Sequence, residues 1–153
     1  MKIRSQVPIL IADDDQDDCN MIKEALQESR LLNQLNFVHD GEELIKYLDH
    51  KSKAGHSLPG LILLDLNMPK KDGREALKEI KSNPNLRQIP IVVLTTSKAE
   101  EDIFKTYNLG VNSFITKPIA FDSMVTIMRE LGRYWFEIVE LPDIKFNAES
   151  GHK

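Results

Sequence analysis

The sequence has few of the features that mark a secreted, membrane-spanning or nucleic-acid-coating protein. It contains a single cysteine, Cys19, which excludes an internal disulfide and fits a reducing compartment. No apolar run approaches the roughly 18 residues of a membrane-spanning helix, and residues 1–8 contain no hydrophobic signal core. Acidic residues outnumber basic ones by 24 to 20, so the chain has no basic excess for coating nucleic acid. These absences predict a cytoplasmic protein with neither a membrane nor a nucleic-acid partner.

What is present is typical of one globular domain. The chain has 153 residues, of which 41% are hydrophobic and 29% charged, enough to bury a core of its own. We find no internal repeat and no low-complexity linker. We therefore expect one domain over residues 1–141 and a short C-terminal tail over residues 142–153.

Five short apolar runs predict strands. They are Ile9–Ala12, Leu35–His39, Leu61–Leu64, Ile91–Leu94 and Ser113–Thr116. Apolar runs of this length, bounded by polar residues, are typical of strands buried on both faces of a parallel sheet. Apolar stripes at helical spacing follow each run, namely Met21–Leu32, Leu44–Leu48, Ala76–Ile80, Ile103–Tyr107 and Phe121–Leu141. The alternation predicts an α/β fold with helices on both faces of the sheet.

Polar side chains close four of these strands. In an open parallel sheet, the C-terminal ends of the strands meet along one edge, where functional sites gather. The residues at these ends are Asp13, Asp14, Asp65, Thr95 and Lys117. Each residue type alone has an ordinary structural role, because Asp caps helices, Thr suits strands and Lys is usually solvated. Their combination at one edge predicts a site.

The residue types at this edge suit phosphoryl transfer. Three carboxylates close together repel one another, and a bound divalent cation such as Mg²⁺, which prefers oxygen ligands, removes that repulsion. A carboxylate can attack phosphorus and form an aspartyl phosphate. The cation and Lys117 would then neutralise the phosphoryl oxygens, and Thr95 would donate a hydrogen bond to one of them. In the loop after Asp65, we expect Gly73 to adopt a positive φ.

Four segments together resemble the response-regulator receiver domains of two-component signalling. They are ILIADDD, LILLDLNMPKKDG, IVVLTTS and FITKP, and the resemblance spans about residues 5 to 135. It implies a flavodoxin-like receiver fold, a doubly wound five-stranded parallel sheet in the order 2-1-3-4-5. It also implies a single-domain response regulator that accepts a phosphoryl group from a sensor histidine kinase and then switches a protein-interaction surface.

The resemblance assigns the metal and the acceptor. Asp65 matches the phosphoacceptor. The ligands of Mg²⁺ are then Asp13 through water, Asp14 directly, Asp65, and the backbone carbonyl of Asn67. Asp15 is an additional acid, which either raises the metal affinity or caps the following helix.

The resemblance also assigns the switch. Thr95 matches the switch hydroxyl and Lys117 the phosphate-binding lysine. Phe114 matches a switch aromatic that is often tyrosine, and a plain core residue is the alternative. The peptide between Lys117 and Pro118 is cis in the family.

The C-terminal segment bears on the partners. The residues after Pro118 leave no room for a DNA-binding or enzymatic output domain, so we expect output through a downstream protein. The segment resembles small regulators that partner phytochromes, which implies a phytochrome-type kinase. Apolar residues from Met124 to Ile138 have heptad-like spacing. For Trp135–Leu141, a homodimer contact and a folded-back tail fit equally well.

Three other classes of protein share part of the pattern. A Mg²⁺-dependent phosphatase of the haloacid dehalogenase type also uses an aspartate at a strand end, but it needs an acid two residues later, where this chain has Asn67. A receiver-like module that binds proteins without being phosphorylated would carry the same residues. A flavodoxin-type ligand-binding module needs a phosphate-cradling glycine loop after the first strand, which is missing here.

Overall fold

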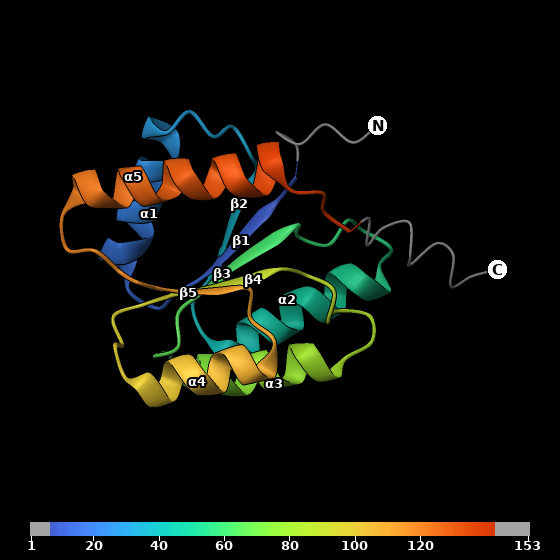
Figure 1. The fold of residues 1–153 in the computed structure, drawn as a ribbon. Coiled ribbons are helices and arrows are strands. Elements are labelled where there is room, and N and C mark those ends of the chain that lie inside the picture. The colour runs from blue at the N-terminus through green and yellow to red at the C-terminus, as the bar shows by residue number, and fades with distance from the viewer. Residues whose placement is uncertain (1–6, 143–153) are drawn as a thin grey trace.

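The computed structural model describes residues 7–142, in which five strands alternate with five α-helices. The strands are β1 (Ile9–Ala12), β2 (Leu35–Val38), β3 (Leu61–Leu64), β4 (Ile91–Thr95) and β5 (Ser113–Thr116). The helices are α1 (Gln16–Glu28), α2 (Gly41–Lys53), α3 (Gly73–Ser82), α4 (Glu100–Leu109) and α5 (Phe121–Arg133), which continues into a π-helical turn, η2 (Tyr134–Ile138). All neighbouring strands are parallel, in the order β2-β1-β3-β4-β5. This order confirms the predicted doubly wound receiver fold (Figure 1).

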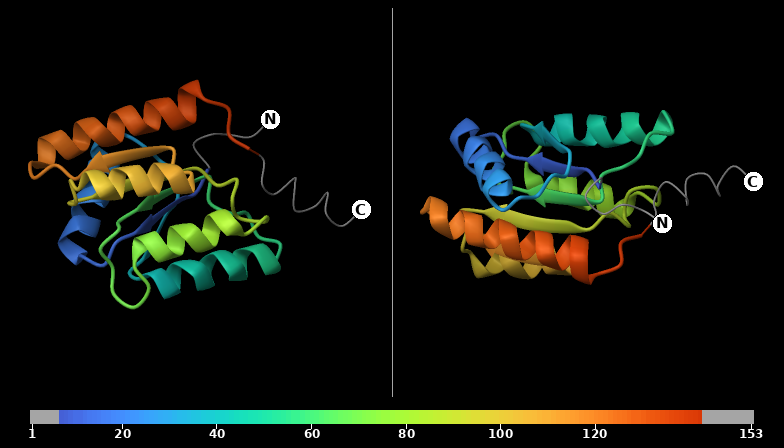
Figure 2. Two further views of the ribbon diagram at one scale, coloured as in Figure 1. Left: turned by 60° about the horizontal axis from the view of Figure 1, so that its bottom comes forward. Right: turned by 90° about the horizontal axis from the view of Figure 1, so that it is seen from above.

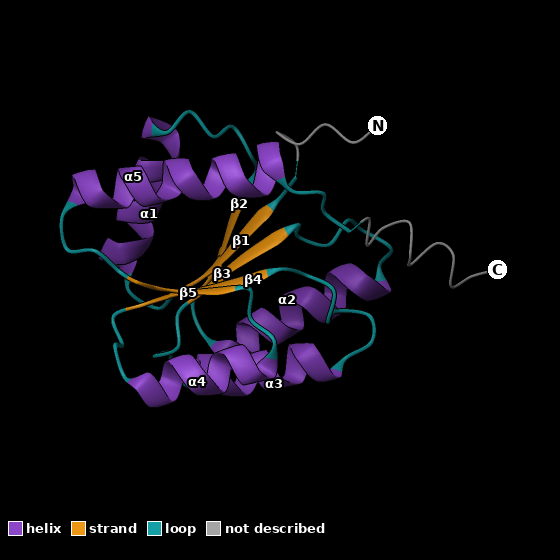
Figure 3. Cartoon of the chain, viewed as in Figure 1, coloured by secondary structure: helices purple, strands orange, loops and turns teal. Residues whose placement is uncertain are grey.

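Helices cover both faces of the sheet. Helices α1 and α5 lie on one face, and α2, α3 and α4 lie on the other (Figures 2 and 3). Successive strand residues point to opposite faces, so Ile9 and Ile11 pack in the core under α1 and α5, whereas Leu10 and Ala12 pack in the core under α2 to α4. This two-sided burial explains why the strand runs are apolar throughout. No helix in residues 7–142 is long and apolar enough to cross a membrane.

Local side-chain chemistry sets most helix boundaries. The carboxylates of Asp15, Asp40 and Asp72 each accept a backbone N–H from the first turn of the helix that follows. The capping alternative for Asp15 is therefore confirmed. Helix α4 ends at Leu109 and is followed by Gly110, whose φ of 107° is the left-handed cap expected of a glycine there.

Helix α1 ends earlier than the apolar stripe predicted. Its last residue is Glu28, because Arg30 has a φ of 61°, a left-handed conformation that a helix interior does not accommodate. Leu32, which we expected on the apolar stripe, lies beyond the helix with 84% of its surface exposed.

The C-terminal helix also ends before its predicted limit. The helical segment stops at Ile138 rather than at Leu141, and Val139 is extended. Trp135 is buried in the core under α1 and α5, and Leu141 packs against the same core, beside Gly60 at the start of β3. In the described residues, Trp135 and Leu141 therefore pack on the chain's own core, and the homodimer contact stays a prediction. The predicted tail lies outside the described residues from position 143 onward.

Candidate functional site

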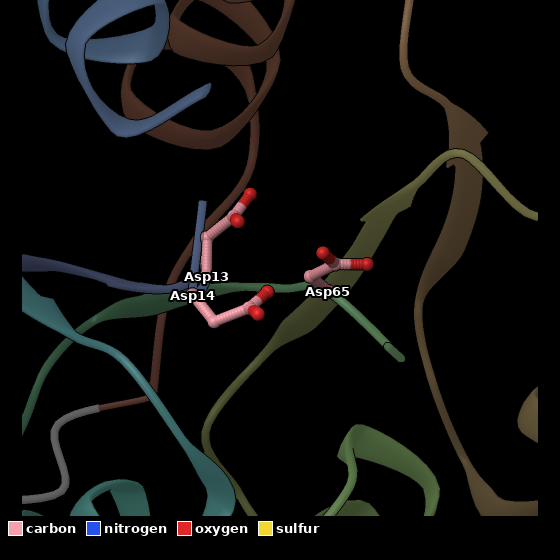
Figure 4. Close-up of side chains that lie close together, drawn as sticks. All are labelled: Asp13, Asp14 and Asp65. Carbon is pink, nitrogen blue, oxygen red and sulfur yellow. The ribbon is translucent and has the colours of Figure 1, made fainter. Parts of the chain in front are cut away.

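The strand register brings the acids after β1 and β3 to the same level. Ala12 and Leu64 are register partners, so the next residues, Asp13 and Asp65, leave the sheet side by side. The backbone N–H of Asp65 donates to the Ala12 carbonyl at 2.9 Å, which holds this alignment one residue past the strands. Oxygen atoms of Asp13, Asp14 and Asp65 all lie within 4.8 Å of one another (Figure 4).

These three carboxylates could hold a divalent cation. Asp13 and Asp65 are buried, whereas Asp14 is exposed, so solvent reaches the cluster on the Asp14 side. A hard cation that keeps several water ligands, as Mg²⁺ does, fits three carboxylates with one open side. The third acid of the segment after β1, Asp15, is exposed and accepts a hydrogen bond from the backbone N–H of Asp18. Its carboxylate therefore belongs to the helix cap and not to the cluster.

Thr95, the last residue of β4, is completely buried beside Asp65. Its hydroxyl donates to Oδ1 of Asp65 at 2.6 Å. The backbone N–H of Asn67 points to the same oxygen at 3.3 Å, while the Asn67 residue itself is exposed. One oxygen of the Asp65 carboxylate is thus contacted by two donors, one at the end of β4 and one in the loop after β3.

Lys117 occupies the other side of the same carboxylate. Its position follows from the register, because Thr116 is the partner of Thr95. The Lys117 Nζ lies 2.6 Å from Asp13 Oδ2, 2.7 Å from Asp18 Oδ2 and 3.2 Å from Asp65 Oδ2. The structure therefore brings Lys117 and Thr95 together at one edge of the sheet, where they contact different oxygens of Asp65.

Burial and pairing shift the pKa values of this ion cluster. Burial raises the pKa of Asp13 to about 6, even though Lys117 bonds to the charged form and works against the shift. Burial alone would lower the pKa of Lys117, but its hydrogen bonds to Asp13 and Asp18 outweigh burial and raise the pKa. The lysine is therefore a permanent positive charge at neutral pH.

Gly73 has a different role from the one predicted. We expected a positive φ, but the positive φ in this loop belongs to Lys70, at 65°. Gly73 instead allows a close backbone approach, because a Cβ there would lie 2.2 Å from the carbonyl oxygen of Asp65 and 2.7 Å from Cα of Leu66. The missing side chain lets the start of α3 pack directly on the backbone of Asp65.

The predicted cis peptide between Lys117 and Pro118 is wrong for this structure. No peptide bond in the described part of the chain is cis. Trans is the more stable form of an X–Pro bond by about 0.5–1 kcal/mol. With the trans bond, the Lys117 ammonium lies 2.6 to 3.2 Å from all three of its carboxylates.

Phe114 lies on β5, the edge strand of the sheet. Its ring is partly buried and packs against the core under α2 to α4. Its backbone N–H donates to the hydroxyl of Tyr107 in α4 at 3.2 Å. The ring thus has core contacts on one side, and its role as a switch stays a prediction.

Sequence reasoning missed two polar contacts near the site. The contact of Asp18 with Lys117 was not foreseen; the place of Asp18 in the first turn of the helix that follows β1 was the available signal. The second is the ion pair of Arg74 with Asp102, which also accepts a hydrogen bond from Ser97 at 2.7 Å. No spacing in the sequence connected these three residues.

Parallel strands that deliver three acids, a hydroxyl and a lysine to one pocket define a receiver domain. The family model described as the response regulator receiver domain matches residues 9–129. The chain belongs to this family, whose members work in phosphorylation-based two-component signalling.

Similar proteins place the chain within the family. It is 41% identical over 135 residues to response regulator Rcp1 of Synechocystis sp., covering 88% of this chain and 92% of Rcp1. The structure of the phosphorylated cyanobacterial phytochrome response regulator RcpA matches with a TM-score of 0.83 at 43% identity, over 90% of this chain and 99% of that chain. The Mn²⁺-bound form of Rcp1 matches with a TM-score of 0.80 at 39% identity, over 89% and 99%. These matches confirm the predicted fold and the resemblance to phytochrome-associated regulators.

Proposed function

We propose that this receiver domain accepts a phosphoryl group on Asp65 from a sensor histidine kinase in a Mg²⁺-dependent reaction. The observation that supports this most is that hydrogen-bond donors contact both carboxylate oxygens of Asp65. The Thr95 hydroxyl bonds to one carboxylate oxygen at 2.6 Å, and the Lys117 ammonium lies 3.2 Å from the other. A preorganised hydroxyl and an ammonium are the groups that stabilise the charge of a phosphoryl group in transit.

The transfer is a simple displacement at phosphorus. One carboxylate oxygen of Asp65 attacks, a P–O bond forms, and the P–N bond to the kinase imidazole breaks, leaving the electron pair on the imidazole nitrogen. Lys117 neutralises one phosphoryl oxygen. The Thr95 hydroxyl turns away from Asp65 and donates to another phosphoryl oxygen.

Asp13, Asp14, Asp65 and the carbonyl of Asn67 would hold the metal. Mg²⁺ supplies charge neutralisation to the transferring group when it is bound. The three carboxylates suit it by charge and by ligand type. The Mn²⁺-bound form of the relative Rcp1 supports a divalent-ion requirement.

The output is a change of surface rather than a chemical product. An aspartyl phosphate adds about −1.5 to −2 charge beside Thr95. When the Thr95 hydroxyl moves toward the new oxygens, the Phe114 ring can rotate into the vacated space. The surface formed by α4 and β5 then changes, and a downstream protein binds it, which is a shift between two existing states.

The relatives support the kind of kinase that donates the phosphoryl group, and a buried cysteine supports the location in the cell. RcpA is a phytochrome response regulator, which supports a phytochrome-type sensor kinase as the donor for this chain. Cys19 is buried, and its thiol donates to the carbonyl of Asp13 at 3.4 Å. A free cysteine inside the fold supports a reducing, cytoplasmic location.

Asn67 argues against a phosphatase as the alternative function. A haloacid dehalogenase-type enzyme needs a general acid two residues after its nucleophile, and an amide at position 67 cannot protonate a leaving group. A receiver that acts by binding alone needs neither the Thr95 hydroxyl nor the Lys117 ammonium on Asp65. We therefore favour the phosphoacceptor, which also assists its own phosphorylation and dephosphorylation without acting as an enzyme on other molecules.

The test is to label the chain with acetyl phosphate as a small phosphodonor. Incubation with Mg²⁺ should add one phosphoryl group by intact mass, and peptide mapping should place it on Asp65. Asp65→Asn should fold and take no label, and chelation of Mg²⁺ should prevent labelling of the unmodified chain. Equal labelling of Asp65→Asn would overturn the assignment, and sustained release of phosphate with many turnovers would favour the phosphatase.

A further inference from the structure

We infer that Asp18 is a positioning residue for phosphoryl transfer, an inference that rests on the function proposed above. Its carboxylate lies in the first turn of α1, outside all four segments that resemble the family signatures. Asp18 Oδ2 is 2.7 Å from the Lys117 Nζ, a contact between residues 99 positions apart in the chain. Asp18 therefore acts on the reaction through Lys117, not by touching the phosphoryl group.

The three contacts of the Lys117 ammonium differ in length, and this difference directs one of its N–H groups toward Asp65. A lysine ammonium has three N–H donors, and within residues 7–142 three carboxylates surround this one. The contacts to Asp13 and Asp18 are short, 2.6 and 2.7 Å, while the contact to Asp65 is 3.2 Å. The two short bonds fix two N–H groups, so the third is directed at the acceptor. A phosphoryl oxygen on Asp65 can take over this longest contact without breaking either short one.

Asp18 differs from the other two partners in what the reaction demands of it. Asp13 faces the metal cluster, and an oxygen of Asp65 becomes esterified. Asp18 neither belongs to the metal cluster nor receives the phosphoryl group, so its hydrogen bond to Lys117 can persist through phosphorylation and dephosphorylation. Because the Lys117 side chain is only 4% exposed, few water molecules can replace a lost partner, and the ammonium would reorient toward its remaining carboxylates.

Asp18 also has a second effect, which slows phosphorylation instead of speeding it. Its negative charge repels an anionic phosphodonor, so removing it should speed the approach of the donor. A substitution at the neighbouring Asp17 distinguishes the positioning of Lys117 from the repulsion of the phosphodonor. Asp17 lies in the same helical turn, is exposed, and is not among the partners of Lys117 in the described part of the chain. A substitution at Asp17 removes the same charge and leaves the lysine untouched.

The experiment compares Asp18→Ala, Asp18→Asn and Asp17→Ala with the unmodified full-length chain. The rate constant for phosphorylation by acetyl phosphate in saturating Mg²⁺ is followed by intact mass, and Mg²⁺ affinity is measured separately without phosphodonor. We expect Asp18→Ala to be about tenfold slower, the loss typical of one hydrogen bond to a charged group. Asp17→Ala should match or slightly exceed the unmodified chain. Asp18→Asn should recover part of the rate, because its amide oxygen still accepts a bond from Lys117.

Each result supports or overturns the inference. Equal rates for Asp18→Ala and Asp17→Ala would reduce Asp18 to a surface charge, and equal rates for Asp18→Asn and Asp18→Ala would exclude positioning. A loss of Mg²⁺ affinity in Asp18→Ala that parallels the loss of rate would make Asp18 part of the metal site instead. If Asp18→Ala does not fold, the comparison of Asp18→Asn with Asp17→Asn decides, with the former expected to be slower. Failure of the unmodified chain to take label on Asp65 would refute the proposed function itself, a different result from any of these.

Discussion

Arg74 and Asp102 join α3 to α4 through two parallel hydrogen bonds, each 2.7 Å long, from Nε and Nη2 to the two carboxylate oxygens. Asp102 also accepts the Ser97 hydroxyl at 2.7 Å, and the backbone N–H of Ser97 points to Thr95 Oγ1 at 3.5 Å. The ion pair between two helices is therefore connected, through the loop after β4, to the hydroxyl that bonds to Asp65. This connection leads to a prediction about stability.

Asp102→Asn should lower the free energy of unfolding by about 2 kcal/mol at pH 7. The hydrogen bond from Arg74 lowers the pKa of Asp102 from 3.8 to about 2. A carboxyl with a depressed folded pKa stabilises the fold above its unfolded pKa, and the contribution disappears as pH falls from about 4 to 2. Urea unfolding at several pH values should show the gap between variant and native chain closing over this range. Glu101→Gln is the control, since the Glu101 pair with Lys105 is exposed and contributes little.

Asp13 should make the stability of the metal-free protein depend on pH in the opposite direction. Burial raises the pKa of Asp13 from 3.8 to about 6. A raised folded pKa contributes stability that is complete below the unfolded pKa and is lost as pH rises through the folded value. Between pH 7 and pH 5, the native chain should therefore gain about 1 kcal/mol relative to Asp13→Asn in EDTA. Saturating Mg²⁺ should remove this gain, because the metal requires the deprotonated carboxylate.

The control for this pH dependence is the variant itself. Any group whose protonation the substitution leaves unchanged contributes equally to the native chain and to Asp13→Asn, so the difference in their stability isolates the contribution of Asp13. Parallel stability curves for the two proteins in EDTA would contradict the assignment.

Gly73→Ala should destabilise the fold by about 2–3 kcal/mol and slow the phosphorylation of Asp65. The added Cβ would meet the backbone oxygen of Asp65 and the Cα of Leu66. These atoms cannot move without shifting the backbone that carries the phosphoacceptor. Gly132→Ala is the matched control, because the three atoms nearest to its Cβ would all be side-chain atoms of Leu31, two of them 2.5 Å away at the end of a flexible residue. Thermal unfolding and the rate of labelling should both separate the two variants. Normal labelling of Gly73→Ala would show that the loop tolerates the extra atom.

Trp135→Ala should cost about 3–5 kcal/mol of stability, the range for truncating a buried aromatic residue. Trp135 is 8% exposed in the core under α1 and α5, whereas Ile138 in the same π-helical turn is 60% exposed. Ile138→Ala should therefore change the stability by less than about 0.5 kcal/mol. Chemical unfolding measures both, and light scattering measures the mass in solution. Suppose that the native chain is a dimer, that Ile138→Ala dissociates it, and that Trp135→Ala leaves the fold intact. These results together would support the homodimer contact.

The strand ends could be predicted because their signal is local. A short apolar run followed by a polar residue marks both a buried strand and the side chain that closes it, as with Leu64 and Asp65 or Thr116 and Lys117. The rule that parallel strands expose their C-terminal ends along one edge then places these side chains together. The strand order and the role of each residue needed more than spacing, and they came from the family resemblance.

Contacts between side chains of different elements could not be predicted in this way. Asp18 and Arg74 are charged residues on helices, where the ordinary expectation is a solvated face. Their partners, Lys117 and Asp102, are fixed by how α1 and α4 sit on the sheet. Gly73 shows a second limit, because a positive φ and a close backbone approach both require glycine and the sequence does not distinguish them.

The lysine that balances the acidic cluster comes from the last strand of the sheet. Asp13, Asp18 and Asp65 are all present in the first half of the chain, and Lys117 is more than fifty positions further on. A ribosome that makes the protein from its N-terminus therefore exposes three like charges long before their counterion emerges. Lys117 can pair with these carboxylates only after β5 has been made, so the ion cluster that links β1, α1 and β3 forms late in synthesis.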